Sequence, residues 1–396
     1  MPLRPPPFAS RQSSGRSSLT SPPRPSTRAS KLARVLHPHL FVPRPDHGDN
    51  AEAVVGGYAF SATLAIQDIT GLATSGVSAA HIAKRLEPSA ESEAMLFGLT
   101  SSQHLRPVAN MGYPELFAED LDFVDAWLFV SLPLLEDRGV IEANFTFDSE
   151  LAPLPGEPVP GAPWESSLLL LDDLSARLAR PTRQLWVTHA LDAEEPPHVR
   201  EFGYQAAFRE DQGTFSISAI EGLPGPEGTA DAEFAVIEGP GFFSRRKAGA
   251  EEVQQFSRLL TEASRDYPRG ELVMDTIEWD IERIRDAGAR LQDRGGAQLT
   301  GLAYVNSVIV GLCEVVRFTA DDAKVCELGL VYVLPEHRGR GIGSAMLRAS
   351  LTRAKEIWED LETVYCSYPA DSPAANAIMR GLNAEVVSST TAWQKS

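Results

Sequence analysis

Cysteine and long apolar runs are both scarce in this chain of 396 residues. Its three cysteines, Cys313, Cys326 and Cys366, form no CxxC pair, and their odd number is atypical of a disulfide framework. No apolar stretch approaches the roughly 20 residues that a membrane-spanning helix needs. The sequence therefore predicts a cytoplasmic protein without a membrane partner.

Clustered metal ligands are also lacking. The closest group of histidines, His37, His39 and His47, lies in a proline-rich stretch that has no helical or hairpin pattern to orient ligands. We therefore predict no metal site.

The first 45 residues lack Asp and Glu but contain eight Lys and Arg. The formal charge of −18 is the balance of +8 there and −26 in the rest of the chain. Such an acidic body disfavours nonspecific binding to nucleic acid and favours cationic or amine substrates. Residues 1–30 are mostly Ser, Pro and Arg, so we predict that residues 1–45 form a disordered tail. We favour a solvated tail or an over-extended translation start as the origin of this segment. A transit peptide is the alternative.

Residues 232–396 show a regular alternation of strand and helix patterns. The element order is β-α-α-β-β-β-α-β-α-β, which indicates an α/β (α+β) fold with a mixed, mostly antiparallel sheet flanked by helices. Short connections between the middle three strands are typical of hairpins. The predicted strands are 232–238, 300–305, 308–316, 325–333, 363–368 and 386–393, and the predicted helices are 251–264, 277–291, the segment after Gly343 and 372–382.

Residues 126–217 repeat part of this order more weakly. The predicted elements are strands 126–135 and 140–147, helix 164–179, strand 184–190, helix 199–208 and strand 214–217. Their order predicts an internal duplication with two tandem domains, a hypothesis that rests on pattern and not on sequence identity. We place the domains at 46–221 and 232–396, joined by a Gly/Pro-rich linker at 222–231.

A glycine-rich turn follows the predicted strand 325–333. Gly339, Gly341 and Gly343 alternate with other residues there, and Arg338 and Arg340 add two cations. Consecutive main-chain N–H groups at a helix N-terminus bind phosphate, and glycine lets the backbone approach the anion closely. The pattern therefore predicts a pyrophosphate site. The alternative is an ordinary glycine-rich turn with two solvated arginines, which is more typical of two glycines than of three.

Two common phosphate motifs are missing at this turn. A Walker A loop needs a lysine directly after its last glycine, and none follows Gly343. A dinucleotide fingerprint needs GxGxxG, but its third glycine would fall at Ser344 or Met346. The sequence therefore argues against a P-loop and against Rossmann-type binding.

The stretch 333–343 resembles the acyl-CoA signature (Q/R)xxGx(G/A) of the GNAT N-acyltransferase superfamily, with Arg338, Gly341 and Gly343 at the fixed positions. The resemblance covers about residues 232–396. It implies transfer of an acetyl group from acetyl-CoA to a small-molecule or peptide amine. In this family the signature strand separates from the next strand, and the acyl-CoA enters the gap. The residues that the resemblance assigns to acyl-CoA binding are Val331, Val333, Arg338, Gly339, Arg340, Gly341, Ile342, Gly343, Ser344 and Asn376.

The resemblance also implies a general base. Glu327 stands where the family's strand commonly carries a carboxylate that accepts the ammonium proton, and strict alternation would point it the same way as Val331 and Val333. A solvated strand carboxylate is the alternative interpretation. Glu314 on the preceding strand is the second candidate base.

This sequence departs from the family's usual pattern at the general acid. It is normally a tyrosine in the last helix, but Met379 stands in the corresponding stretch and has no proton to donate. Tyr368 is the substitute candidate. Asn376 either contacts the pantetheine arm or caps the helix.

The first half lacks the glycine-rich turn. The corresponding stretch contains prolines without an N–H group, at Pro153, Pro155, Pro158, Pro160 and Pro163. We predict a degenerate GNAT-like domain that binds no CoA and either shapes the acceptor cleft or stabilises the active half. A catalytically silent CoA-binding sensor or scaffold is the alternative function.

Overall fold

The computed structural model describes residues 35–44, 48–72, 78–154, 157–226, 229, 231–239, 249–318 and 324–396. They divide into two compact units, residues 208–390 and residues 35–207 with 391–396. We call these the C-terminal unit and the N-terminal unit. The expected tail lies outside the described residues up to residue 34, but its end does not fit the expectation, because His37–Leu40 forms a strand paired with a second strand.

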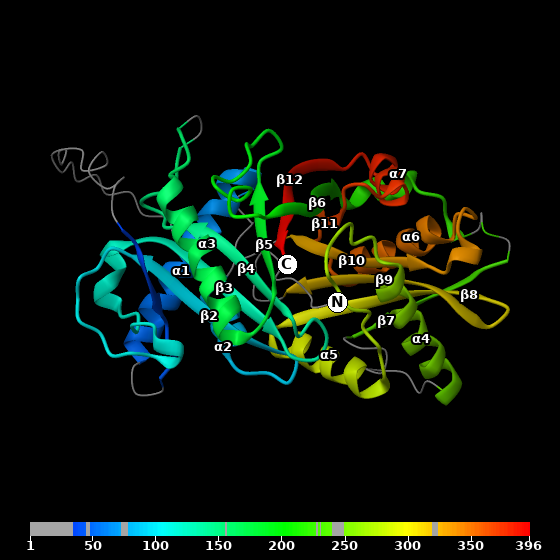
Figure 1. Ribbon diagram of the computed structural model, residues 1–396. Helices are drawn as coiled ribbons and strands as arrows, with labels where there is room; N and C mark the ends of the chain where they lie inside the picture. The colour runs from blue at the N-terminus through cyan, green and yellow to red at the C-terminus, as the bar shows by residue number, and fades with distance from the viewer. Residues whose placement is uncertain are drawn as a thin grey trace. The chain divides into compact units, whose positions relative to one another are not determined.

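The N-terminal unit contains a sheet in the order β1-β2-β3-β4-β5 with helices on both faces (Figure 1). All neighbours are antiparallel except β4 and β5, which are parallel. One core lies under α3, around Leu168 and Leu171, and a second lies under α1 and α2, around Tyr58 and Ile82. The elements are β1 His37–Leu40, α1 Gly48–Thr70, α2 Ala79–Leu86, β2 Ser92–Thr100, β3 Val124–Pro133, β4 Val140–Phe147, α3 Gly161–Leu178 and β5 Thr182–His189.

The C-terminal unit has the predicted element order. Its strands follow the order β12-β6-β11-β10-β9-β8-β7, and only β10 and β11 are parallel among the pairs with a described register. The elements are β6 Gln205–Ser216, β7 Glu233–Glu238, α4 Ala250–Asp266, α5 Ile281–Asp293, β8 Gly296–Val305, β9 Val308–Phe318, β10 Val325–Val333, α6 Ile342–Ile357, β11 Thr363–Pro369, α7 Pro373–Gly381 and β12 Glu385–Lys395. No described helix is both long and apolar enough to cross a bilayer.

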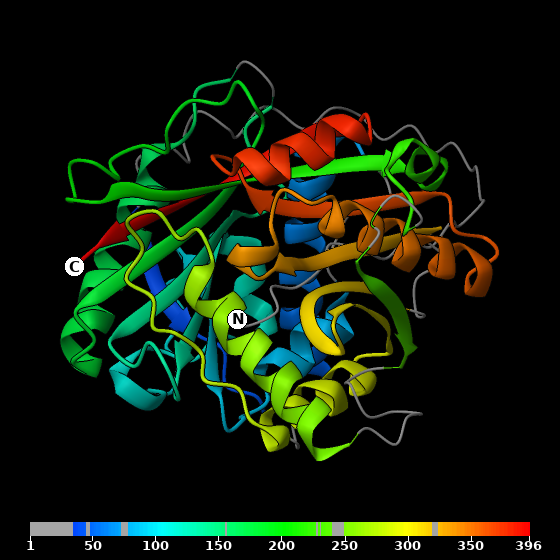
Figure 2. The ribbon, with the colours of Figure 1, turned by 90° about the vertical axis from the view of Figure 1, so that its right-hand side faces the viewer.

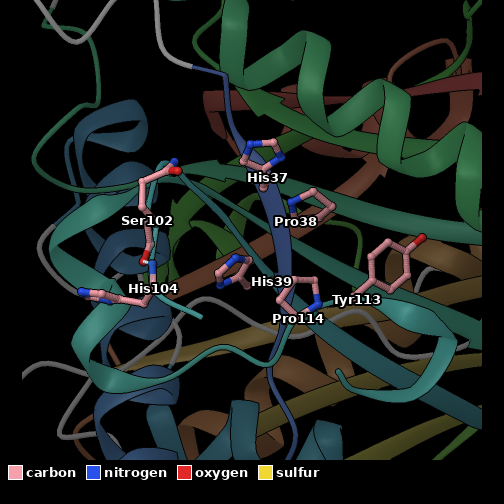
Figure 3. Close-up of a pocket in the computed structure, with 8 residues that line it drawn as sticks. His37, Pro38, His39, Ser102, His104, Tyr113 and Pro114 are labelled. Carbon is pink, nitrogen blue, oxygen red and sulfur yellow. Dashed lines mark hydrogen bonds between the residues drawn. The ribbon is translucent and has the colours of Figure 1, made fainter. Parts of the chain in front are cut away.

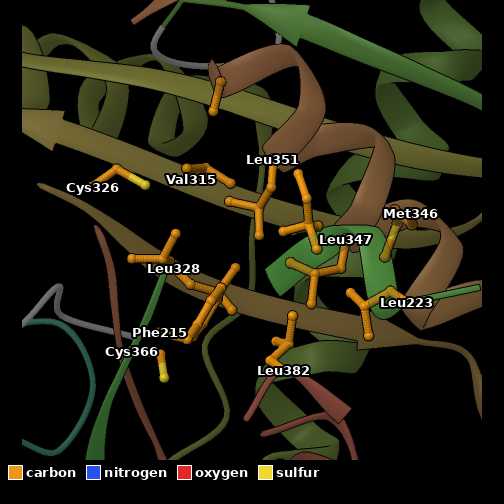
Figure 4. Packing of buried hydrophobic residues seen from close by; sticks show 14 of the residues in the cluster. Phe215, Leu223, Val315, Cys326, Leu328, Met346, Leu347, Leu351, Cys366 and Leu382 are labelled. Atoms are coloured by element: carbon orange, nitrogen blue, oxygen red, sulfur yellow. The ribbon is translucent and has the colours of Figure 1, made fainter. Parts of the chain in front are cut away.

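Two hydrophobic cores fix the layers of the C-terminal unit. On one face, Leu347 and Leu351 of α6 pack against Leu328 of β10 and Phe215 of β6, as Figure 4 shows. On the other face, Phe256 of α4 belongs to a core with residues of β8, β9 and β10. Figure 2 shows α6 and α7 on the opposite side of the strands from α4 and α5. The sheet therefore has an α6/α7 face and an α4/α5 face.

Strand β6 differs most from the sequence prediction. It pairs antiparallel with β11 over residues Glu210–Ser216 and so completes the sheet of the C-terminal unit. In the N-terminal unit, the end of β12 takes the corresponding place, because Thr391 and Gln394 are hydrogen-bonded to His189 and Gln184 of β5. The unit boundary therefore falls at 207/208, not in the predicted linker 222–231, of which residues 227, 228 and 230 lie outside the described residues.

Two predicted helices are corrected. Residues 199–208 do not form a helix, because Gly203 has a φ of +85° and β6 begins at Gln205. The helix expected at 277–291 begins at Ile281, because the Asp280 side chain accepts the N–H of Arg283 and caps the first turn. Ile277 is buried in the extended segment before the cap, so its place in the apolar stripe was misleading.

Candidate functional site

A gap opens between β10 and β11. Their parallel pairing runs from Val325–Thr363 to Leu328–Cys366 and ends there, although β10 continues to Val333. Unpaired main-chain groups on neighbouring strands are open to hydrogen bonds from an inserted molecule. The strand separation expected from the resemblance is therefore present.

A β-bulge in β10 reverses the side-chain alternation. Leu328 pairs with Val315, but Val331 pairs with Cys313, so β10 has one extra residue here. Glu327 consequently points to the α4/α5 face, while Val331 packs on the α6/α7 face. The predicted common direction of Glu327 with Val331 and Val333 is wrong for this reason.

The glycine-rich turn connects β10 to α6. Gly339 and Gly341 have φ values of 75° and 76°, which glycine adopts without strain, and Gly341 is the N-cap of α6. Among the described residues, no acceptor is hydrogen-bonded to a main-chain N–H of Gly339, Arg340, Gly341, Ile342, Gly343 or Ser344. An added Cβ at Gly339 would meet no atom within 4 Å. The turn therefore presents a run of donors at a helix N-terminus, an arrangement suited to an anion.

The two arginines of the turn are engaged with acidic residues. Arg338 Nη2 lies 2.8 Å from Asp266 Oδ2, and its Nε donates to the Val333 carbonyl at 2.8 Å. Arg340 Nη2 lies 3.1 Å from Asp231 Oδ2. The Val333 carbonyl is thus used inside the protein.

The candidate bases lie on the α4/α5 face. Glu327 is half-buried, and burial raises the pKa of its carboxyl to about 7. It makes no hydrogen bond or ion pair with any residue that the structure describes. Burial also raises the pKa of Glu314, which accepts a hydrogen bond of 3.1 Å from Gln298. Glu327 is thus a carboxylate poised to titrate near neutrality beside the gap.

The candidate acid lies on the other face. Tyr368 is buried in the core beneath α6 and α7, and burial raises its pKa to about 12. Met379 is also buried there, with its Sδ 3.3 Å from Cys366 Sγ. Asn376 donates its side-chain N–H to the Ala370 carbonyl at 2.8 Å, and Ser372, not Asn376, caps α7. Tyr368 and Glu327 therefore flank the gap from opposite faces of the sheet.

A polar network on the α4/α5 face was not predicted. Glu210 of β6 accepts hydrogen bonds from Tyr267 at 2.7 Å and from Ser367 at 3.3 Å, and Gln212 continues the network to Ser367 and Ser388. Glu210 and Gln212 were not predicted as site residues, because a helix was predicted at 199–208 and strand β6 was therefore not recognised. Residues 209–212 are all polar, so the sequence carries no alternation that marks Glu210 and Gln212 as inward-facing.

In the N-terminal unit the pairing of the two parallel strands also stops early, and two aromatic side chains stack next to that point. Pairing of β4 with β5 ends at Asn144–Trp186, before the end of either strand. Phe145 stacks on Trp164 with ring centroids 3.9 Å apart, and Trp164 lies in the first turn of α3. A Cβ at Gly161, where α3 begins, would lie 2.7 Å from His198 Nε2. A Cβ at this helix start would thus meet a side chain, whereas a Cβ at Gly339 would meet none.

A pocket of about 360 Å³ lies elsewhere in the N-terminal unit (Figure 3). Asp120 accepts hydrogen bonds from two of the lining residues, Ser102 at 2.7 Å and His104 at 3.0 Å, and from Arg106 at 2.9 Å. Burial alone raises the pKa of Asp120, but these hydrogen bonds outweigh it and lower the pKa to about 2. The described residues contain no group of three side chains placed to hold a metal ion. The pocket is lined by His37, Pro38, His39, Ser102, Gln103, His104, Tyr113 and Pro114, none of which was predicted as a site residue.

Comparisons with known proteins agree with this geometry. The model of the acetyltransferase (GNAT) family matches residues 256–381. A tandem GNAT protein from the clavulanic acid biosynthesis pathway has a similar structure, with a TM-score of 0.61 and 15% identity over 91% of this chain and 98% of that chain. A GCN5-related N-acetyltransferase from Sphaerobacter thermophilus has a TM-score of 0.54 and 16% identity over 90% of this chain and 95% of that chain. No curated protein matches the chain. Residues 256–381 of the C-terminal unit therefore match the GNAT acetyltransferase family, and the chain as a whole has the fold of tandem GNAT proteins.

Proposed function

We propose that the protein is an N-acetyltransferase that transfers the acetyl group of acetyl-CoA to a primary amine of a small molecule or peptide. The observation that carries the proposal is the run of unused N–H groups at Gly339–Ser344, next to the gap between β10 and β11. The three buried, free cysteines are compatible with a reducing compartment, for which we propose the cytoplasm.

The turn and the gap would divide the binding of acetyl-CoA between them. The N–H groups of Gly339–Ser344 would hold the pyrophosphate, together with the positive end of α6. Ile342 contributes its N–H alone, because its side chain is buried in the core. The main chain of β10 around Val331 and Val333, apart from the Val333 carbonyl that Arg338 already uses, would bind the pantetheine arm. Asn376, at the start of α7, would contact the same arm through its side-chain oxygen, because its hydrogen bond to the Ala370 carbonyl uses only the side-chain nitrogen.

The reaction would be direct attack within a ternary complex. The neutral amine attacks the thioester carbonyl, a C–N bond forms and the C–S bond breaks. Glu327 takes the proton that the nitrogen releases, and its pKa of about 7 suits a base at neutral pH. Tyr368 would donate a proton to the departing thiolate from the α6/α7 face.

Thiol release tests this function. Purified protein is incubated with acetyl-CoA and single amines from a library, the free thiol is measured with a thiol reagent, and products are identified by mass spectrometry. We expect amine-dependent thiol release and an acetylated product with at least one amine class. Binding of acetyl-CoA without turnover for every amine, and no effect of Glu327→Gln, would instead support a CoA-binding sensor.

A further inference from the structure

The last residue of α4, Asp266, joins three parts of the acyl-CoA site. Its Oδ2 accepts a hydrogen bond from the Tyr332 hydroxyl at 2.8 Å and another from Arg338 Nη2 at 2.8 Å. Tyr332 belongs to β10, and Arg338 begins the glycine-rich turn. One carboxylate oxygen therefore links the end of α4, the open strand and the turn.

The Arg338 side chain makes two further contacts besides the hydrogen bond to Asp266. Its Nε donates to the Val333 carbonyl, and its guanidinium lies over the Tyr332 ring, 5.4 Å from the centroid. Burial, followed by the hydrogen bond to Asp266, raises the pKa of Tyr332, so the phenol stays protonated and remains a donor. A planar guanidinium with two fixed acceptors has little rotational freedom.

The charge of Asp266 is unfavourable for the proposed ligand. A carboxylate near a pyrophosphate site repels the anion, and it also neutralises a cation that would otherwise attract it. This repulsion can be outweighed if Asp266 fixes the conformation of the glycine-rich turn. A turn already fixed in its binding conformation loses less conformational freedom on binding.

We propose that Asp266 is a positioning residue for acetyl-CoA, acting through Arg338 and Tyr332 to hold the glycine-rich turn in its donor-presenting conformation. The inference rests on the proposed function and deepens it. It assigns Arg338 to holding the turn, and it leaves the contact with pyrophosphate to the main-chain N–H groups.

The variant Asp266→Asn distinguishes electrostatic repulsion of acetyl-CoA by Asp266 from positioning of the turn by Asp266, because the two effects change the Kd in opposite directions. If electrostatic repulsion dominates, removal of the negative charge tightens acetyl-CoA binding. If Asp266 positions the turn, the Kd of acetyl-CoA rises about threefold to tenfold, in line with the loss of a charged hydrogen bond at a partly exposed site. We expect the rise, measured by isothermal titration calorimetry on the full chain, with kcat at saturating acetyl-CoA unchanged.

Two further variants control this test. Glu262→Gln removes a carboxylate one turn earlier in α4 that pairs with Arg265 at 2.7 Å, and it should not weaken binding. Arg338→Lys keeps the positive charge but loses the planar fork, and it should weaken binding about as much as Asp266→Asn does. This variant also serves if Asp266→Asn fails to fold, as judged by circular dichroism.

The possible results distinguish failure of the positioning role of Asp266 from failure of the proposed acetyltransferase function. Wild-type protein that binds no acetyl-CoA overturns both. Wild-type binding together with equal or tighter binding by Asp266→Asn, or with full affinity in Arg338→Lys, overturns the positioning role and leaves the proposed function standing.

Discussion

Leu328 of β10 and Cys366 of β11 form the last pair between these parallel strands, and the bulge in β10 begins directly after Leu328, while the pairing with β9 resumes at Val331. The opening of the sheet and the change of side-chain direction thus occur at one point. Glu327, one residue before the bulge, remains on the α4/α5 face. This relationship puts the proposed base, Glu327, on the α4/α5 face, while Val331 beyond the bulge packs on the α6/α7 face.

Replacement of the candidate base should change both rate and pH dependence. Because burial raises the pKa of Glu327 to about 7, the side chain is protonated and inactive as a base below that pH. Wild-type kcat/KM should therefore rise with pH through about 7, before the amine acceptor itself titrates at higher pH.

Glu327→Gln should lower kcat by on the order of 10²-fold and abolish this limb of the profile. Glu314→Gln serves as the control, because Glu314 lies on the same face of the neighbouring strand, and it should retain the limb. A limb near pH 7 that persists in Glu327→Gln would assign the base elsewhere.

Tyr368→Phe tests the candidate acid. Loss of the hydroxyl should lower kcat by on the order of 10²-fold while the KM for acetyl-CoA changes little, because the ring still fills the same core. Tyr304→Phe is the matched control, since that hydroxyl is bonded to Glu252 of α4 and not to a group at the gap. Unchanged kcat in Tyr368→Phe would mean that the thiolate leaves without this donor.

Strand β6 makes the C-terminal unit dependent on residues that precede the predicted domain start at 232. Phe215 of β6 is buried in the core beneath α6, and β6 covers the whole edge of β11. A fragment 232–396 should therefore be poorly soluble and lack cooperative unfolding, because it exposes that edge and leaves a cavity in the core. A fragment 205–396 should unfold cooperatively. Circular dichroism melting curves compare the two, and equal stability would argue against an essential role for β6.

Local patterns in the sequence predicted most elements of the C-terminal unit. The apolar stripe of α6 and the glycines at 339, 341 and 343 are short-range signals, and they located the turn. The bulge in β10 could not be predicted, because residues 328–333 are all apolar or glycine and so conceal the change of alternation, and Gly329 is its only local mark. Its consequence for the direction of Glu327 was missed for the same reason.

Long-range pairing explains the other differences. The partner of β6 is β11, some 150 residues later, and no local pattern specifies such a partner. The polar network around Glu210 was therefore invisible from the sequence. Helices α1 and α2 and strand β2 were not predicted either, and with them the first half shows the same β-α-α-β-β-β-α-β order as the second half.

The most direct test of the account is titration of acetyl-CoA into the full chain by calorimetry. We predict one site per chain, because the N-terminal unit lacks the glycine-rich turn and Phe145 stacks on Trp164 at the start of the corresponding helix α3. Gly341→Asp should lose binding by more than about 100-fold, since a carboxylate would enter the run of N–H groups. Gly341→Asn adds a side chain of the same shape that tolerates positive φ, and it should lose far less. Wild-type affinity in Gly341→Asp would contradict the claim that this turn binds the pyrophosphate.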